Sequence, residues 1–205
     1  APAMMIACVA SRIQCAPTMV GAGCTRDDVC ACDLMILRTT MKPDKPHAGN
    51  LRIGRYSAPG VVYFITNNVE QKHPLLTPAC REIVIDALKW ARDNGRLWLL
   101  GYVIMDDHFH FMMMLRDGFL LFKVMMSLKR HTSREINKII DSAGQLWQEG
   151  YHDHVIRDET DFWNHLHYMH NNPVRRGWVE KPEDYLWSTA HASREGDVDW
   201  PAIGY

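Results

Sequence analysis

Cysteine is scarce in most of this chain and concentrated near its start. Five of the six cysteines precede residue 40, and only Cys80 follows. No Cys-x-x-Cys pair occurs, and the spacings match no common zinc pattern. The main part of the chain therefore carries no sign of a zinc ribbon or a disulfide framework. A structural zinc protein that uses the N-terminal cysteines stays open as an alternative.

Long apolar runs and an excess of positive charge are also missing. No apolar run reaches membrane-spanning length, and the apolar stretch near the N-terminus lacks the preceding basic region of a signal peptide. We therefore expect a cytoplasmic protein with no membrane partner. The formal net charge is −1, so a nucleic-acid role would need local basic patches rather than a globally positive surface.

The length of 205 residues indicates one domain with appendages. Residues 1–40 show no sustained periodicity and are predicted to be a disordered leader or an upstream extension, with Met41 as a candidate biological start. Residues 41–58 are a predicted N-terminal arm, 59–192 the main domain and 193–205 a C-terminal tail.

The main domain shows alternating strand and helix patterns. Apolar periodicity, Pro and Gly predict strands at 61–66, 96–105, 108–115 and within 147–156, and helices at 77–93, 119–140, 159–171, 174–179 and 182–190. In the first helix, Ile83, Ala87 and Trp90 are expected to face the core. The order β-α-β-β-α-β predicts an α+β fold: a ferredoxin-like antiparallel sheet with helices packed on one face.

The pair His108 and His110, separated by Phe109, is the most informative pattern. Two residues at i and i+2 on a strand point to the same face, about 7 Å apart along the chain. Both imidazoles can therefore share one divalent cation. The apolar runs on either side predict a buried, rigid strand, as a metal site needs.

A second pattern lies about 60 residues on, in the helix predicted after Asp158. Phe162, Leu166 and Met169 form its apolar stripe. Tyr168 lies away from that stripe, one turn before Asn172. The phenol is either displayed for chemistry or is a surface tyrosine at the edge of the core.

Attack by a tyrosine on a phosphodiester would join the two patterns. A phenol has a pKa near 10, so it needs activation or a polarised electrophile. Mg²⁺ or Mn²⁺ held by His108 and His110, with Asn172 as a third ligand, would stabilise the charge that develops on phosphate. The product would be a covalent 5′-phosphotyrosine and a free 3′-hydroxyl. No nucleotide cofactor is needed, because the phosphodiester energy is kept.

Longer segments carry a resemblance to a known family. Residues 102–110 (YVIMDDHFH) resemble the metal-binding strand pair of single-tyrosine HUH transposases. Residues 147–158 (WQEGYHDHVIRD), 168–179 (YMHNNPVRRGWV) and 185–188 (YLWS) are similar to signatures of the REP-associated tyrosine transposases within that group. The resemblance extends from about Arg55 to Ala190.

The resemblance implies an HUH-type fold and a monomeric, metal-dependent endonuclease. Such enzymes cleave and rejoin single-stranded DNA at repetitive extragenic palindromic hairpins. It also implies that His108 and His110 are metal ligands, Tyr168 the nucleophile and Asn172 the polar third ligand.

One departure from the family pattern concerns Asp106, which stands where the family usually has proline. It adds a negative charge near the incoming phosphate. A catalytically weak protein that only binds DNA hairpins is therefore the main alternative, and a replication initiator or relaxase with the same chemistry is another.

Contacts to DNA are expected from basic side chains beside the site. Lys123, Arg130 and Arg134 share one helix face and form a predicted phosphate track, with a solvated face as the alternative. Arginines near the first strand and around the tyrosine helix are further candidates for base and phosphate contacts. They are Arg52, Arg55, Arg157, Arg175 and Arg176. Trp147, Tyr151 and Trp163 are candidates for base stacking or for the core.

Overall fold

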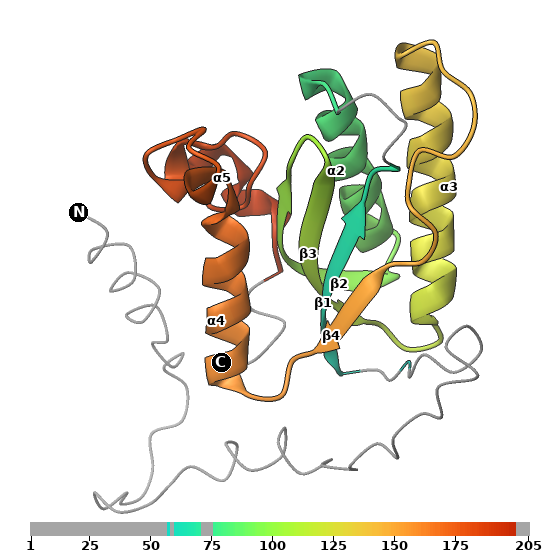
Figure 1. Ribbon diagram of the computed structural model, residues 1–205. Coiled ribbons are helices and arrows are strands. Elements are labelled where there is room, and N and C mark those ends of the chain that lie inside the picture. Colours follow the sequence, from blue (N-terminus) through green and yellow to red (C-terminus); the bar gives the residue numbers. More distant parts are fainter. Residues whose placement is uncertain (1–56, 58–59, 71–75, 200–205) are drawn as a thin grey trace, which may run out of the picture. The chain divides into compact units, whose positions relative to one another are not determined.

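The computed structural model describes residues 57, 60–70 and 76–199 (Figure 1). All of them belong to the unit that spans Pro46–Tyr205. The predicted leader, most of the predicted arm, and Arg52 and Arg55 lie outside the described residues. Among the residues that are described, no helix is long and apolar enough to cross a membrane.

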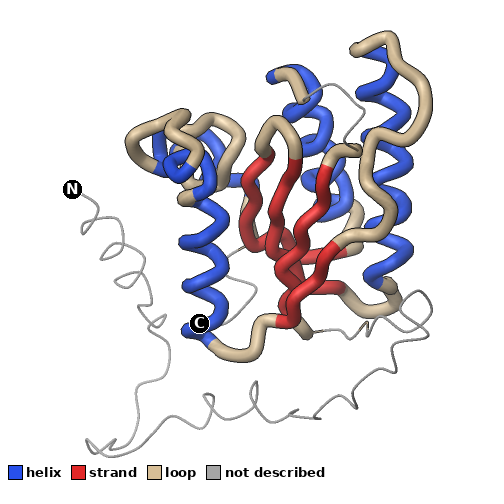
Figure 2. The backbone as a smooth tube through the Cα atoms, viewed as in Figure 1, coloured by secondary structure: helices blue, strands red, loops and turns tan. Residues whose placement is uncertain are grey.

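A four-stranded antiparallel sheet forms the centre of the described structure (Figure 2). The strands lie in the order β2-β3-β1-β4. Their bounds are Val62–Asn68 for β1, Leu97–Ile104 for β2, His108–Leu115 for β3 and His152–Val155 for β4. The predicted α+β class with an antiparallel sheet is confirmed.

Helices α2 (Pro78–Asp93) and α3 (Leu121–Ile139) cover one face of this sheet (Figure 1). Thr77 caps α2, because its hydroxyl accepts a hydrogen bond from the Cys80 amide. Pro78 fits the first turn of α2, where its missing N–H has no partner to lose. Of the three α2 residues predicted to face the core, Ala87 is buried and Ile83 packs against the core, but Trp90 is 49% exposed.

Helix α4 (Glu159–His170) packs on the opposite face, so helices cover both sides of the sheet rather than one. The predicted stripe of Phe162, Leu166 and Met169 is buried there. Both faces are apolar because strand neighbours such as Phe64 and Ile65 point to opposite sides and are both buried. A Cβ on Gly101 of β2 would lie 2.9 Å from Met169 Cε, so glycine permits this close approach.

The chain after α4 has less helix than the sequence suggests. Helix α5 covers only Asn172–Arg175, and the short 3-10 helices η1 and η2 cover Pro182–Asp184 and Ala192–Asp197. The helix predicted over 182–190 is mostly wrong, because Ser188 instead forms a β-bridge with Val103. The chain around Ser188 runs along the outer edge of β2 and forms hydrogen bonds with backbone groups that an edge strand would otherwise leave unpaired.

Residues that the sequence assigns to the C-terminal tail also bind this edge. The Asp199 carboxylate accepts a hydrogen bond from the Leu99 amide at 2.9 Å. Asp197 is 6% exposed; its carboxylate accepts the Tyr102 hydroxyl at 2.6 Å and lies 2.8 Å from Lys89 Nζ. The Tyr102 hydroxyl, the Asp197 carboxylate and the Lys89 ammonium group therefore satisfy one another's hydrogen-bonding and charge requirements beside the sheet.

We expect acid to weaken this network. Burial raises the pKa of Asp197, but Lys89 and Tyr102 stabilise the carboxylate more strongly, so its net pKa lies below the usual value. A lowered folded-state pKa adds stability above the unfolded-state pKa, and that stability is lost as the pH falls through the folded value. The free energy of unfolding of Asp197→Asn should therefore be lower than that of the wild type at pH 7, and the gap should shrink below pH 3.8.

Urea unfolding from pH 7 to pH 3 measures this gap. Asp117→Asn, at an exposed carboxylate, is the matched control. A gap that stays constant down to pH 3 would contradict the role assigned to Asp197.

Candidate active site and metal centre

The two histidines of the HFH pattern lie side by side on β3. Strand pairing places His110 opposite Thr66 and His108 opposite Asn68 on β1. The ring centroids of His108 and His110 are 4.7 Å apart, and the ring planes make an angle of 74°. Inclined rings at this separation can direct two nitrogen lone pairs toward one ion.

His110 is buried and neutral. Its exposed fraction is 4%, and its Nδ1 lies 2.7 Å from Thr66 Oγ1. Burial and the neighbouring His108 lower the pKa of His110 to about 3. The Nε2 atom is buried and has no hydrogen-bond partner within the described part of the chain. A buried nitrogen without a partner is costly unless something binds it.

His108 is held by a carboxylate. Its Nδ1 lies 2.5 Å from Asp107 Oδ1, and the other oxygen of Asp107 lies 2.6 Å from Arg176 Nη2. Burial raises the pKa of Asp107, but Arg176 and His108 lower it more, so its net pKa lies below the usual value. Asp107 therefore stays ionised and fixes the ring orientation of His108.

The two histidines fit a divalent cation. Each engages Nδ1 with an oxygen atom, Thr66 for His110 and Asp107 for His108, which leaves Nε2 as the ligand atom. Metal-binding histidines usually have such a partner on the second ring nitrogen. Neutral imidazoles bind divalent transition metals, whereas carbonyl oxygens such as that of an asparagine side chain suit Mg²⁺ and Mn²⁺.

Asn172 lies at the start of α5, one turn after Tyr168. Its amide nitrogen donates to the carbonyl oxygens of Tyr168 at 2.9 Å and Met169 at 3.4 Å. The nitrogen thus caps the last turn of α4. Its carbonyl oxygen is the side-chain atom that would serve as a metal ligand.

Tyr168 projects from α4 next to the histidines. It is 44% exposed, although its neighbours Phe162, Leu166 and Met169 are buried. Its ring centroid lies 5.7 Å from that of His110. The Arg175 guanidinium lies 5.3 Å from the centre of the Tyr168 ring. An accessible phenol, two imidazoles and the Arg175 guanidinium therefore lie close together at one end of the sheet.

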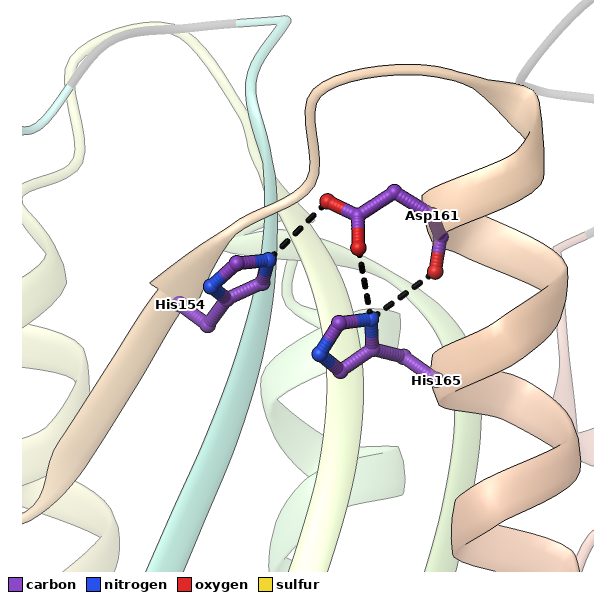
Figure 3. Close-up of side chains that lie close together, drawn as sticks. All are labelled: His154, Asp161 and His165. Carbon is purple, nitrogen blue, oxygen red and sulfur yellow. Dashed lines mark hydrogen bonds and ion pairs between the residues drawn. The ribbon is translucent and has the colours of Figure 1, made fainter.

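A second cluster joins β4 to the first turns of α4 (Figure 3). The Asp161 carboxylate lies 2.9 Å from His154 Nε2 and 3.0 Å from His165 Nδ1. His165 also contacts Phe64, whose ring stacks on His110. Through Phe64, the cluster therefore supports the position of His110, the predicted metal ligand.

These three side chains have the composition of a metal site, but their geometry favours a hydrogen-bonded cluster. The His154 and His165 rings are stacked, with centroids 4.4 Å apart and planes within 18°. An ion bound by two imidazole nitrogens must lie close to both ring planes, and stacked planes do not meet near the rings. Asp161 thus acts as a shared hydrogen-bond acceptor for both histidines.

The predicted DNA-contacting residues divide into two groups. Arg175 and Arg176 lie beside Tyr168 and Asp107, and Arg157 is exposed just before α4. The three basic residues predicted to form a phosphate track are exposed on α3, which covers the opposite face of the sheet from Tyr168. They are Lys123, Arg130 and Arg134.

Among the aromatic candidates for base stacking, Trp147 belongs to the core. It is 1% exposed, and its indole nitrogen donates to Thr132 at 2.8 Å. Tyr151 and Trp163 are partly buried. The reading of Trp147 as a base-stacking residue is therefore wrong.

Sequence reasoning missed Thr66, Phe64 and Asp161. They reach the site through strand pairing and helix packing, which local periodicity does not specify. The alternation of β1 places Phe64 and Thr66 on one face of the strand. The only sequence signal for these two residues was therefore a polar residue two positions after an aromatic one.

Comparison with known proteins identifies the family. The model of the family described as "Transposase IS200 like" matches residues 59–172. The chain belongs to the IS200-like transposase family. This assignment makes it an enzyme of the tyrosine transposase class, which cuts and rejoins DNA, and confirms the predicted resemblance.

Two curated relatives carry a more specific name. The REP-associated tyrosine transposase of Escherichia coli (strain K12) is 26% identical over 152 residues, which cover 71% of this chain and 88% of that protein. A putative REP-associated tyrosine transposase of Haemophilus influenzae (strain ATCC 51907 / DSM 11121 / KW20 / Rd) is 29% identical over 110 residues, or 47% of this chain and 62% of that protein.

A solved structure of a REP-associated tyrosine transposase bound to a REP hairpin has the same fold. The TM-score is 0.55 at 24% sequence identity, with 66% of this chain and 80% of that chain covered. The two-faced arrangement of helices around the antiparallel sheet thus belongs to a transposase fold.

Thr66 offers a test of the metal centre that leaves both histidines in place. Thr66→Val keeps the branched shape and removes the oxygen next to His110 Nδ1. Loss of such a partner typically weakens metal binding about 10- to 100-fold. Titration calorimetry with Mn²⁺ should show this loss, while Thr160→Val, at an exposed threonine, should bind as the wild type does. Equal affinity in the two variants would refute the role of Thr66.

Proposed function

We propose that this transposase is a metal-dependent single-stranded DNA endonuclease and strand transferase that acts at hairpin repeats. The observation that carries the proposal is the placement of the exposed Tyr168 phenol beside His108 and His110, whose Nδ1 atoms are both engaged. Family membership supports the class of chemistry, and the names of the relatives support repeat hairpins as substrates.

Tyr168 is the proposed nucleophile. Its phenol gives up a proton, its oxygen bonds to phosphorus, and the bond between phosphorus and the 3′ oxygen breaks. The 3′ oxygen takes up a proton and leaves as a hydroxyl, while the 5′ phosphate stays on the tyrosine. Attack by another 3′-hydroxyl reverses these events and releases the enzyme.

The surrounding side chains orient the phosphate and its charge. His108, His110 and Asn172 would hold Mg²⁺ or Mn²⁺, which would supply Lewis-acid stabilisation of the negative charge that develops in the transition state. Arg175 lies against the Tyr168 ring and is available to a second phosphate oxygen. Asp107 contacts both His108 and Arg176. It thereby fixes the proposed metal ligand His108 relative to the positively charged guanidinium of Arg176.

The alternative is a protein that binds DNA hairpins without cleaving them, and the observation that favours it is Asp106. Asp106 Oδ1 lies 3.8 Å from Arg176 Nη1 and makes no hydrogen bond within the described residues. The negative charge of Asp106 therefore partly offsets the positive charge of Arg176 near the site. The backbone of the turn between β2 and β3 is still supported, since the Asp106 carbonyl accepts a hydrogen bond from the Leu76 amide at 2.7 Å.

Incubation of the purified protein with end-labelled hairpin DNA tests the proposal. The substrate is a repeat hairpin with single-stranded flanks from the genome that encodes the protein, and a scrambled strand without a hairpin is the control. We expect a covalent protein–DNA band on a denaturing gel with Mn²⁺, and no band with chelator or with the scrambled strand. Retarded DNA in a native gel with no cleavage in any metal would favour the binding-only alternative.

A further inference from the structure

A cavity formed largely by residues that follow α5 is not used by the chemistry described above. It has a volume of about 330 Å³, and its lining includes Arg81, Trp178, Asp184, Tyr185 and Trp187. Cavities that bind small organic groups have this size or larger and combine apolar walls with a few polar atoms. Trp178 at its rim is 38% exposed, so the cavity wall can be reached from solvent.

Rings and guanidinium groups alternate along this wall. The Arg81 guanidinium lies 4.7 Å from the centre of the Trp187 ring and 5.6 Å from that of Trp178. Tyr185 packs between the two tryptophans, with its ring centroid 5.5 Å from Trp187 and 5.9 Å from Trp178. Aromatic faces and arginines together favour unpaired bases, because every base has a flat π-surface.

One polar group in the wall can match the edge of a base. Asp184 lines the cavity and supplies a carboxylate. Carboxylates accept hydrogen bonds from base amino groups.

The cavity is tied directly to the metal histidines. The Arg176 guanidinium lies 2.6 Å from Asp107, which contacts His108, and 5.8 Å from the centre of the Trp178 ring. The Tyr185 hydroxyl donates to the Ile104 carbonyl at 2.8 Å, at the end of β2 just before the turn to His108. A strand whose phosphate lies at Tyr168 therefore passes close to this cavity.

We propose that this cavity binds an unpaired nucleobase of the single-stranded DNA that flanks the hairpin, with the base stacked on Trp178. The proposal rests on the proposed function, because it assumes a single strand at the Tyr168 site. The captured base fixes the strand's position relative to Tyr168. The exposed patch of Trp178 thus belongs to substrate binding rather than to the fold alone.

Binding of 2-aminopurine-labelled DNA tests this assignment. The probe is a hairpin whose single-stranded flanks carry 2-aminopurine at one position at a time, and a hairpin without flanks is the reference. All proteins carry Tyr168→Phe, so cleavage does not affect the measurement. We expect quenching at one flank position, and Trp178→Ala should abolish it and weaken binding of the flanked hairpin about 5- to 150-fold.

Matched variants separate stacking from a general loss of structure. Trp178→Phe should retain most of the affinity, because it keeps an aromatic face. Trp90→Ala removes another exposed tryptophan that packs on an arginine, on α2, and should bind as the parent does. Trp178→Ala should also leave the affinity for the hairpin without flanks unchanged.

Two results would overturn the assignment while leaving the proposed function in place. One is equal binding by the Trp178→Ala and Trp90→Ala variants, and the other is an equal loss of affinity for hairpins with and without flanks. If the parent protein binds neither hairpin, both proposals are wrong.

Discussion

Tyr168→Phe is expected to abolish the covalent protein–DNA product while leaving DNA binding unchanged. The substitution removes only the oxygen that would bond to phosphorus. The phenyl ring can still pack against His110 and Arg175. Removal of a nucleophile typically lowers the rate by on the order of a thousandfold or more. A denaturing gel measures the adduct, and fluorescence anisotropy on the same hairpin measures the affinity.

The tyrosine control lies elsewhere in the chain. Tyr151→Phe changes a partly buried tyrosine just before β4 and should keep the adduct. Tyr168 is 44% exposed, so the melting temperature of Tyr168→Phe should match that of the wild type. Adduct formation by Tyr168→Phe at the wild-type rate would show that another residue is the nucleophile.

The parts of the fold that the sequence predicts are those with a strong local signal. The cap at Thr77, Pro78 and the apolar period place α2 within a residue of its observed start. The alternation around Phe109 places both histidines on one face of β3. The side of the sheet that α4 covers is not local information, since it depends on apolar residues of β1, β2 and β3 together, such as Phe64, Val103 and Met112.

The candidate site follows the same division. His108, His110 and Tyr168 are visible in the sequence because residue type and spacing suggest their chemistry. Their supporting residues are not, because Thr66 reaches His110 only through the pairing of β1 with β3. Arg176 reaches Asp107 only because the chain turns after α4. The positioning of a site therefore depends on register and packing, which a single sequence does not specify.

His110→Ala is expected to remove both metal binding and cleavage. The substitution deletes the buried Nε2 atom that has no hydrogen-bond partner within the described part of the chain, together with the ring that packs against Phe64 and Tyr168. The remaining His108 cannot hold an ion as two imidazoles can. We expect cleavage to fall by on the order of a hundredfold or more. Titration with Mn²⁺ and the adduct assay measure the two losses separately.

Folding must be separated from metal binding in this variant, because His110 is 4% exposed and its removal leaves a gap beside Phe64. His108→Ala serves that purpose: its side chain is 13% exposed, so truncation there disturbs packing less. Both variants should lose Mn²⁺ binding, whereas His131→Ala, at an exposed histidine of α3, should keep it. If His108→Ala and His110→Ala fold and bind Mn²⁺ as tightly as the His131→Ala control, the ion lies elsewhere. The cluster of His154, Asp161 and His165 would then be the next site to mutate.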